Sequence, residues 1–181
     1  MSKTIFNKNY NGLDLVIRYP SDGDEKAMMD YINELSAEKT FILMQGETMT
    51  LEEEIKYLDS WLEKISKKTG IMLSVFAEDT LIGVGSIELG RYSTKHVGLF
   101  SISIKNEYRG KGIGKLLMSS IIDEAKKQLK DLEIINLTVQ SENIVAQKMY
   151  ESFGFKKYGL LPRGIKLVDG YRDHQLMYKQ I

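Results

Sequence analysis

The sequence predicts a mixed α/β fold in one domain over residues 1–181, with a six- to seven-stranded, mostly antiparallel sheet that carries helices on both faces. Of the 181 residues, 43% are hydrophobic and 28% charged, which is enough apolar material for a sizeable core. The apolar spacing changes from helical to strand-like near residue 71 and then alternates between the two. Because no Gly/Ser run or long charge block marks a linker, we expect no domain boundary.

The first part of the chain is predicted to contain one strand and two helices. A short β-rich run at 14–19 is followed by apolar residues at helical spacing over 24–38. A second helix begins after Thr48 or Thr50, because either side chain can cap it. The apolar but irregular stretch at 39–49 between the helices suits either a loop that covers a substrate or a half-buried connection. The second helix has one apolar face, formed by Leu51, Ile55, Leu58, Trp61, Leu62 and Ile65.

The rest of the chain is predicted to form an antiparallel meander followed by alternating strands and helices. This order predicts a mixed sheet. The expected elements are strands at 71–79, 80–91 and 96–105, a helix at 113–129, a strand at 132–140, a helix at 143–153, and a closing hairpin of 155–168 and 170–180.

Composition excludes several kinds of function. The 25 Lys and Arg balance 25 Asp and Glu, so the chain lacks the basic surplus typical of proteins that bind nucleic acid. The absence of Cys excludes disulfides, thiolate metal sites and a Cys nucleophile, and with two His we expect no metal site. No stretch approaches the roughly 20 apolar residues of a membrane span, and the N-terminus is polar. We therefore expect a cytoplasmic protein with no membrane partner.

A glycine-rich loop lies between the predicted strand at 96–105 and the helix at 113–129. Backbone N–H groups at a helix N-terminus favour a bound phosphate, and glycine lets a ligand approach the main chain closely. The sequence therefore predicts an anion site formed by Arg109, Gly110, Lys111, Gly112, Ile113 and Gly114.

The glycine spacing excludes two common nucleotide sites. The Walker pattern G-x-x-x-x-G-K-S/T does not occur. Gly110, Gly112 and Gly114 give G-x-G-x-G instead of the G-x-G-x-x-G that binds dinucleotides. An alternative remains that the glycines only end the strand and start the helix.

Two motifs in the same order resemble the GCN5-related N-acetyltransferase (GNAT) family over about residues 71–180. R-x-x-G-x-G is matched by Arg109, Gly112 and Gly114, and the second motif, N-x-x-A-x-x-x-Y-x-x-x-G-F, by Asn143, Ala146, Tyr150, Gly154 and Phe155. The resemblance implies an acetyl-CoA-dependent N-acetyltransferase. It also implies that two neighbouring parallel strands splay apart at the centre of the sheet and hold the arm of CoA between them.

The resemblance assigns the cofactor contacts. The pyrophosphate of acetyl-CoA is expected on the glycine loop from Arg109 to Gly114, followed by Lys115. The pantetheine arm carries amides that can pair with a strand edge, which Ile102, Ser103 and Ile104 are expected to supply. Asn143 and Ala146 are expected to contact the arm from the next helix. Asn143 also fits an N-cap, and its amide can serve both roles.

The predicted chemistry is direct attack by an amine on the thioester, because there is no Cys for a covalent relay. The resemblance makes Tyr150 the general acid that protonates the CoA thiolate. The alternative is a tyrosine packed on the sheet with a bonded hydroxyl. The general base is predicted to be Glu88, and His96 is the other titratable group nearby. The alternatives are that Glu88 is a solvated charge, that His96 is a hydrogen-bonded core histidine, and that a water chain carries the proton. The backbone N–H of Ile102 can stabilise the oxyanion.

The acceptor is expected to bind between Thr40–Met49 and Tyr158–Asp173, by resemblance to the family. The C-terminal segment resembles the branch that contains ribosomal-protein N-terminal and polyamine acetyltransferases, so the expected acceptor is a small amine such as a polyamine or a protein N-terminal amine. A different function, a non-catalytic acyl-CoA-binding regulator, also fits the loop. A homodimer is possible, with the closing hairpin as a contact.

Overall fold

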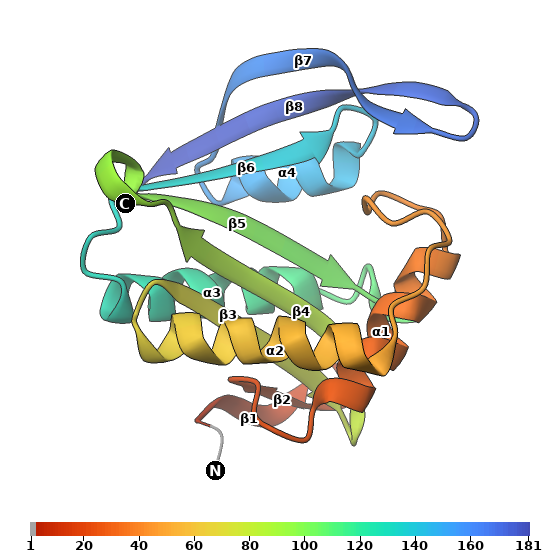
Figure 1. The fold of residues 1–181 in the computed structure, drawn as a ribbon, viewed down its shortest axis with the longest axis vertical. Coiled ribbons are helices and arrows are strands. Elements are labelled where there is room, and N and C mark those ends of the chain that lie inside the picture. The colour runs from red at the N-terminus through yellow and green to blue at the C-terminus, as the bar shows by residue number, and fades with distance from the viewer. Residues whose placement is uncertain (1–2) are drawn as a thin grey trace.

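The computed structural model describes residues 3–181, which form one eight-stranded sheet in the order β1-β2-β3-β4-β5-β6-β8-β7, with helices packed against it (Figure 1). The strands are β1 (Thr4–Tyr10), β2 (Leu13–Arg18), β3 (Gly70–Ala77), β4 (Thr80–Leu89), β5 (Val97–Ile104), β6 (Ile134–Gln140), β7 (Lys156–Leu167) and β8 (Gly170–Gln180). The α-helices are α1 (Glu25–Ala37), α2 (Leu51–Ser66), α3 (Ile113–Gln128) and α4 (Ile144–Ser152). The predicted mixed α/β fold is confirmed.

The helices form a layer on each face of the sheet, as predicted. In Figure 1, α2 lies in front of the sheet and α3 behind it. On one face, α1 and α2 bury a cluster that includes Tyr31 and Trp61, together with Met72 and Phe76 from β3. On the other face, α3 and α4 pack on the larger core cluster. We call the face under α1 and α2 the front face.

The two parallel strands at the centre of the sheet diverge. β5 and β6 pair only from Val97 to Leu99, opposite Ile134 to Asn136. On its other side, β5 continues to pair with β4 as far as Ile104. The edge of β5 beyond Leu99 therefore has no strand partner on the β6 side, which confirms the predicted splay.

The N-terminal strand β1 lies outside the predicted elements and brings the strand count to eight, against an expected six or seven. It pairs with β2 through a two-residue turn at Asn11 and Gly12, between the paired residues Tyr10 and Leu13. Both turn residues have positive φ, 52° and 85°. Positive φ at both positions is typical of a type I′ turn, whose twist matches that of the flanking strands.

The inward face of α2 differs from the apolar face expected from its sequence. Thr50 is the N-cap and forms a capping box with Glu53, which resolves the choice between Thr48 and Thr50. Leu58 and Trp61 are buried as expected, whereas Leu51 and Ile55 are 45% and 40% exposed. Glu54 instead points inward and is buried. The prediction of an apolar face is therefore wrong for the first turn, where a carboxyl group takes the inward position.

Candidate active site

The glycine loop presents a row of free backbone donors at the start of α3. Gly110 and Gly112 have φ values of 76° and 82°, and Gly112 is the N-cap of the helix without a side-chain capping bond. Within residues 3–181, the N–H groups from Gly110 to Gly114 have no hydrogen-bond acceptor. Free N–H groups at the positive end of a helix form a site for an anion such as a phosphate.

The Arg109 side chain forms hydrogen bonds to other residues of the protein. Its Nε donates to the carbonyl of Ile104 at 2.8 Å, and its Nη2 lies 2.5 Å from Oε2 of Glu38 at the end of α1. The other oxygen of Glu38 accepts from the backbone N–H of Asn106 at 3.2 Å. A third bond runs from Nη1 of Arg109 to Oδ1 of Asn106 at 3.3 Å, so the side chain fixes the loop to β5 and α1 with three of its five N–H donors.

Two further contacts fix the end of β5 to α1. The Tyr31 hydroxyl lies 2.8 Å from the Ser103 hydroxyl. Lys105, at the end of β5, forms an ion pair with Glu34. Because both contacts join α1 to β5 or the residue after it, the strand that leads into the glycine loop is held from the front face.

The alternation of backbone bonds in β5 identifies which peptide groups face the splayed gap. Lys105 N–H donates to β4 at Ile82, and the Val97 carbonyl accepts from Gly90. In an antiparallel pair every second residue bonds to its partner strand, so odd-numbered residues of β5 face β4. The backbone groups of Ile102 therefore face the gap, as the predicted oxyanion and arm contacts require, whereas those of Ser103 face β4.

α4 brings Asn143 and Tyr150 to the other side of the gap. Asn143 is the N-cap, and its Oδ1 accepts from the Ala146 N–H at 3.1 Å. Its Nδ2 has no acceptor within the part of the chain that the structure describes, so it remains available to a ligand. Tyr150 follows seven residues later, about 10.5 Å along the same helix face.

The Tyr150 side chain has a buried ring and an unbonded hydroxyl. Only 7% of the residue is exposed, and its ring packs against Phe100 and Phe155, both at 6.1 Å between centroids. No described residue hydrogen-bonds its hydroxyl, and burial raises its pKa to about 12. The phenol is therefore protonated near neutral pH and can donate a proton or a hydrogen bond to a ligand. The alternative of a tyrosine with a bonded hydroxyl finds no support in these contacts.

Two carboxyl groups lie on the front face, one on β4 beside the start of the splay and one in the first turn of α2. Glu88 on β4 is opposite Leu99, the last residue of β5 that pairs with β6. Its Oε2 lies 3.1 Å from Nζ of Lys64 on α2. Glu54 on α2 is 3% exposed, and burial raises the pKa of its carboxyl group. From the sequence, Glu47 and Glu52 to Glu54 could attract a cationic amine, but three consecutive glutamates in a first turn also compensate the helix dipole, so Glu54 was not distinguished from its neighbours.

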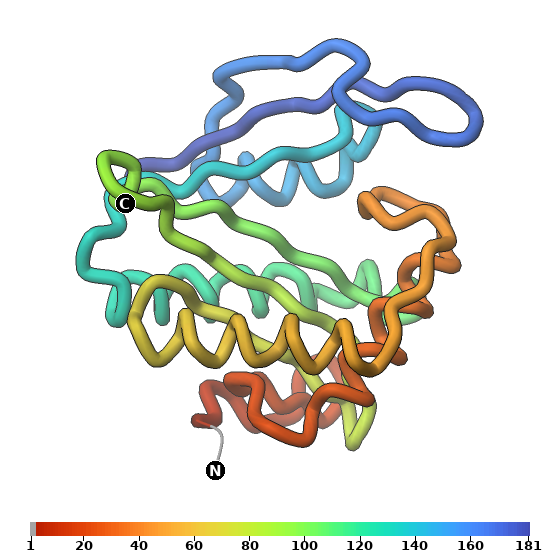
Figure 2. Tube along the Cα trace, viewed as in Figure 1, coloured from red at the N-terminus to blue at the C-terminus, as the bar shows by residue number. Residues whose placement is uncertain are grey.

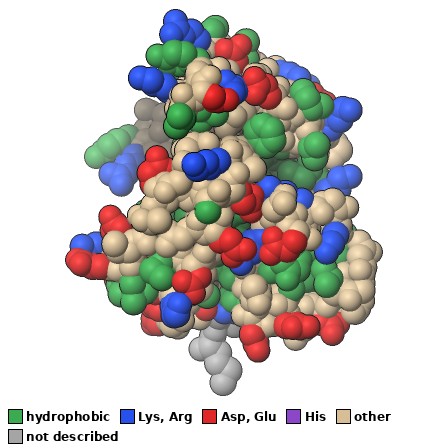
Figure 3. All heavy atoms as spheres, turned by 90° about the vertical axis from the view of Figure 1, so that its right-hand side faces the viewer, with side chains coloured by type: hydrophobic (Ala, Val, Ile, Leu, Met, Phe, Trp, Pro, Cys, Tyr) green, Lys and Arg blue, Asp and Glu red, His purple; other side chains and the backbone are tan. Residues whose placement is uncertain are grey.

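A pocket of about 570 Å³ opens between the segment after α1 and the tip of the β7–β8 hairpin, which lie on the same side of the molecule in Figure 2. Arg172 binds two carboxylates there, Glu142 at 3.0 Å and Asp169 at 2.6 Å. Figure 3 faces this side of the molecule, where acidic and basic side chains are interspersed. The lining residues overlap both segments predicted to bind the acceptor: Lys39, Thr40, Phe41, Gln45, Gln140, Glu142, Leu167, Val168, Asp169 and Arg172.

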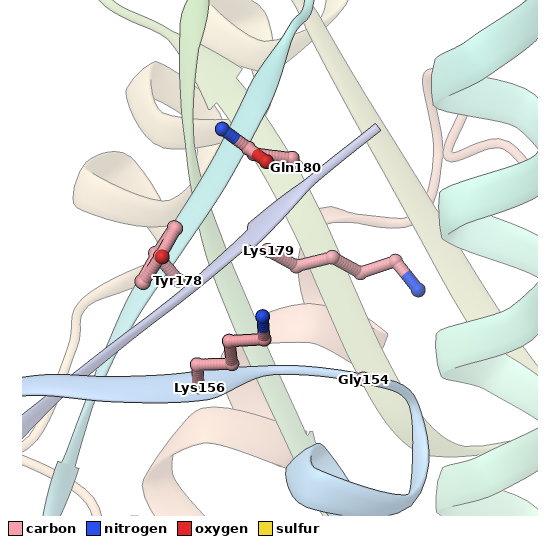
Figure 4. Close-up of a pocket in the computed structure, with 5 residues that line it drawn as sticks. All are labelled: Gly154, Lys156, Tyr178, Lys179 and Gln180. Carbon is pink, nitrogen blue, oxygen red and sulfur yellow. The ribbon is translucent and has the colours of Figure 1, made fainter.

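A smaller hollow of about 230 Å³ contains none of the predicted site residues (Figure 4). Its Lys179 donates to the carbonyl of Phe153 at 2.5 Å. It is lined by Gly154, Lys156, Tyr178, Lys179 and Gln180. Residues 3–181 contain no group of three or more His, Cys, Asp or Glu placed to hold a metal ion, and no helix among them is long and apolar enough to cross a membrane.

Comparisons with known proteins agree with the motifs and the fold. The sequence model of the Acetyltransferase (GNAT) family matches residues 28–155. The L-amino acid N-acetyltransferase AaaT of Escherichia coli is 30% identical over 119 residues, which cover 61% of this chain and 72% of that protein. The ribosomal protein bS18 alanine N-acetyltransferase of the same species is 26% identical over 141 residues, 78% of each chain.

A solved structure extends the similarity over nearly the whole chain. The acetyltransferase of the GNAT family from Streptococcus pneumoniae matches with a TM-score of 0.85 and 28% sequence identity, and the match covers 93% of this chain and 100% of that one. The predicted family is confirmed: the chain belongs to the GNAT family and is an acetyl-CoA-dependent acetyltransferase.

Proposed function

We propose that this acetyltransferase moves the acetyl group of acetyl-CoA to a primary amine by direct attack in a ternary complex. The pyrophosphate would bind the free N–H groups of Gly110 to Gly114, with Lys111 and Lys115 adding positive charge. The arm would lie in the gap between β5 and β6, bonded to Ile102 and to the free amide of Asn143. The observation that carries the proposal is the unbonded Tyr150 hydroxyl beside a gap that holds no strand.

The reaction follows from these positions. The neutral amine attacks the thioester carbonyl from the front face, and the N–H of Ile102 stabilises the oxyanion. When the intermediate collapses, the C–S bond breaks and Tyr150 gives its proton to the CoA thiolate. The proton lost by the amine goes to a base, for which Glu88 on the front face remains our candidate.

The acceptor would enter through the pocket beside the β7–β8 hairpin. Two carboxylates line this pocket, Glu142 and Asp169, and both form ion pairs with Arg172. Their negative charge is therefore already balanced and would attract a polycation only weakly. We keep both acceptor classes in the proposal, a small amine such as a polyamine and a protein N-terminal amine. Amino acids are a third class to test, because a similar protein acts on them.

A thiol-release assay over an acceptor panel tests the proposal. The panel contains spermidine, free amino acids and short peptides with free N-termini, each with acetyl-CoA. Release of CoA with one class and acetylation of its amine by mass spectrometry are expected. Failure to bind CoA in calorimetry at near-millimolar ligand would refute the cofactor assignment. Binding without release for any acceptor would support the non-catalytic regulator instead.

A further inference from the structure

The turn between β1 and β2 contacts the glycine loop across a long stretch of sequence. Asn11 Nδ2 donates to the carbonyl of Lys111 at 3.0 Å, although the two residues are 100 positions apart. Tyr10, the residue before the turn, lies against the same loop: a Cβ at Gly112 would be 2.9 Å from its hydroxyl oxygen. The hairpin that was absent from the sequence prediction therefore lies directly against the predicted cofactor site.

The turn that carries Asn11 is itself well defined. Gly12 N–H donates to Oδ1 of Asn9 at 3.2 Å, and Nδ2 of Asn9 donates to Asp14 at 2.9 Å. Asn11 has a φ of 52°, a conformation that asparagine tolerates better than most residues. The side chain of Asn11 is therefore presented to the loop from a fixed backbone.

The hydrogen bond from Asn11 sets the direction of a cofactor-binding donor. Lys111 C=O and Gly112 N–H belong to one planar trans peptide, in which the oxygen and the hydrogen point in opposite directions. Holding the carbonyl toward β1 and β2 therefore turns the Gly112 N–H away from them. That N–H is one of the donors without an acceptor in the described residues.

We propose that Asn11 is a positioning residue for acetyl-CoA, because it orients the Lys111–Gly112 peptide so that its N–H faces the pyrophosphate. The inference rests on the proposed role of the glycine loop. Gly110 and Gly112 can each adopt several backbone conformations. Without Asn11, the peptide between Lys111 and Gly112 would rotate more freely, and ordering it would reduce the affinity for the cofactor.

Calorimetric titration with CoA tests the proposal on two variants. Asn11→Asp keeps the shape but replaces the donor with a carboxylate oxygen, and Asn11→Gly removes the side chain while keeping positive φ accessible. We expect both to raise the Kd for CoA about three- to tenfold, which is the range for one neutral hydrogen bond. Inorganic pyrophosphate, used as a competitor, should lose affinity by a similar factor. Because Asn11 is exposed, we expect little change in Tm.

Asn9→Ala is the matched control, since it removes hydrogen bonds from the same hairpin without touching the loop. It should leave both affinities within twofold of wild type. Wild-type affinity in both Asn11 variants would overturn the inference, and so would an equal loss in Asn9→Ala, which would show that hairpin stability alone matters. If the wild-type protein binds no CoA, the proposed cofactor site fails instead, so the two failures are distinguishable.

Discussion

Removal of the Tyr150 hydroxyl should separate catalysis from stability. Tyr150→Phe keeps the ring contacts with Phe100 and Phe155, and the hydroxyl it deletes has no partner in residues 3–181. No protein hydrogen bond is lost, so the free energy of unfolding should stay within about 0.5 kcal/mol of wild type. If Tyr150 protonates the CoA thiolate, kcat should fall about 10²- to 10⁴-fold, equivalent to roughly 2.7–5.5 kcal/mol.

The leaving group places the expected loss toward the lower end of that range. A thiol has a pKa of about 8.5, so the thiolate departs fairly well without an acid. The difference in kcat between the variant and wild type should therefore shrink as pH rises above about 8.5. The KM for acetyl-CoA should change little, because in the proposed mechanism the hydroxyl acts only at the sulfur, while the loop and the gap between β5 and β6 bind the rest of the cofactor.

Tyr19→Phe provides the opposite control. The Tyr19 hydroxyl is buried and donates to Oε2 of Glu124 at 3.0 Å. Its removal should lower the unfolding free energy by about 1.5–3 kcal/mol, the range for a hydrogen bond to a charged group, with no change in kcat per folded molecule. Urea denaturation and thiol release would be measured on both variants. A Tyr150→Phe protein that loses stability and keeps its turnover would refute the catalytic role.

Three further substitutions test the neighbouring groups. Gly112→Val should lower both Tm and CoA affinity, because its Cβ would meet Tyr10 at 2.9 Å and its φ is positive; normal Tm with weak binding would contradict this account. Glu88→Gln should lower kcat/KM at least tenfold if Glu88 is the base, whereas a wild-type kcat/KM would exclude that role. Glu54→Gln should stabilise the fold at pH 7 but not near pH 4. Burial raises the pKa of the Glu54 carboxyl group, so folding disfavours its charged form. The wild type should therefore lose stability as pH rises from about 4.5 through the pKa of the folded state. Urea unfolding at both pH values measures the difference in stability between Glu54→Gln and wild type. A variant less stable than wild type at pH 7 would show that the charged carboxylate has a partner.

Local signals predicted most of the sheet and helices because they lie within short windows of sequence. For Asn143 the sequence offered an N-cap as well as a contact with the CoA arm, and the structure shows the capping bond. The start of α2 was also readable, since Thr50 with Glu53 fits the capping-box pattern and Thr48 with Leu51 does not. β1 was missed because its strand is largely polar, although Asn-Gly between two such segments is a strong hairpin signal.

Long-range contacts could not be predicted from motif spacing. Glu38 meets Arg109 from 71 positions away, and Asn11 meets Lys111 from 100. Glu54 was indistinguishable from its two acidic neighbours until the packing of α2 showed which of them points inward. Helical periodicity predicts which side of a helix faces the core only to within about one residue. In α2 the inward side is rotated by about that much, so Glu54 is buried where Leu51 and Ile55 were expected.

In the proposed pyrophosphate site, the bond between Arg109 and Glu38 gives the backbone N–H groups of the loop a larger part in anion binding. A side chain that binds phosphate can be recognised in a motif, but a row of backbone N–H groups works only if the loop holds them in one direction. That direction depends on supports from outside the R-x-x-G-x-G motif: Glu38 at the end of α1 and Asn11 in the β1–β2 turn. If the loop binds the pyrophosphate as proposed, a substitution that spares every motif residue should still weaken acetyl-CoA binding, and loss of the Arg109 guanidinium should also loosen the loop.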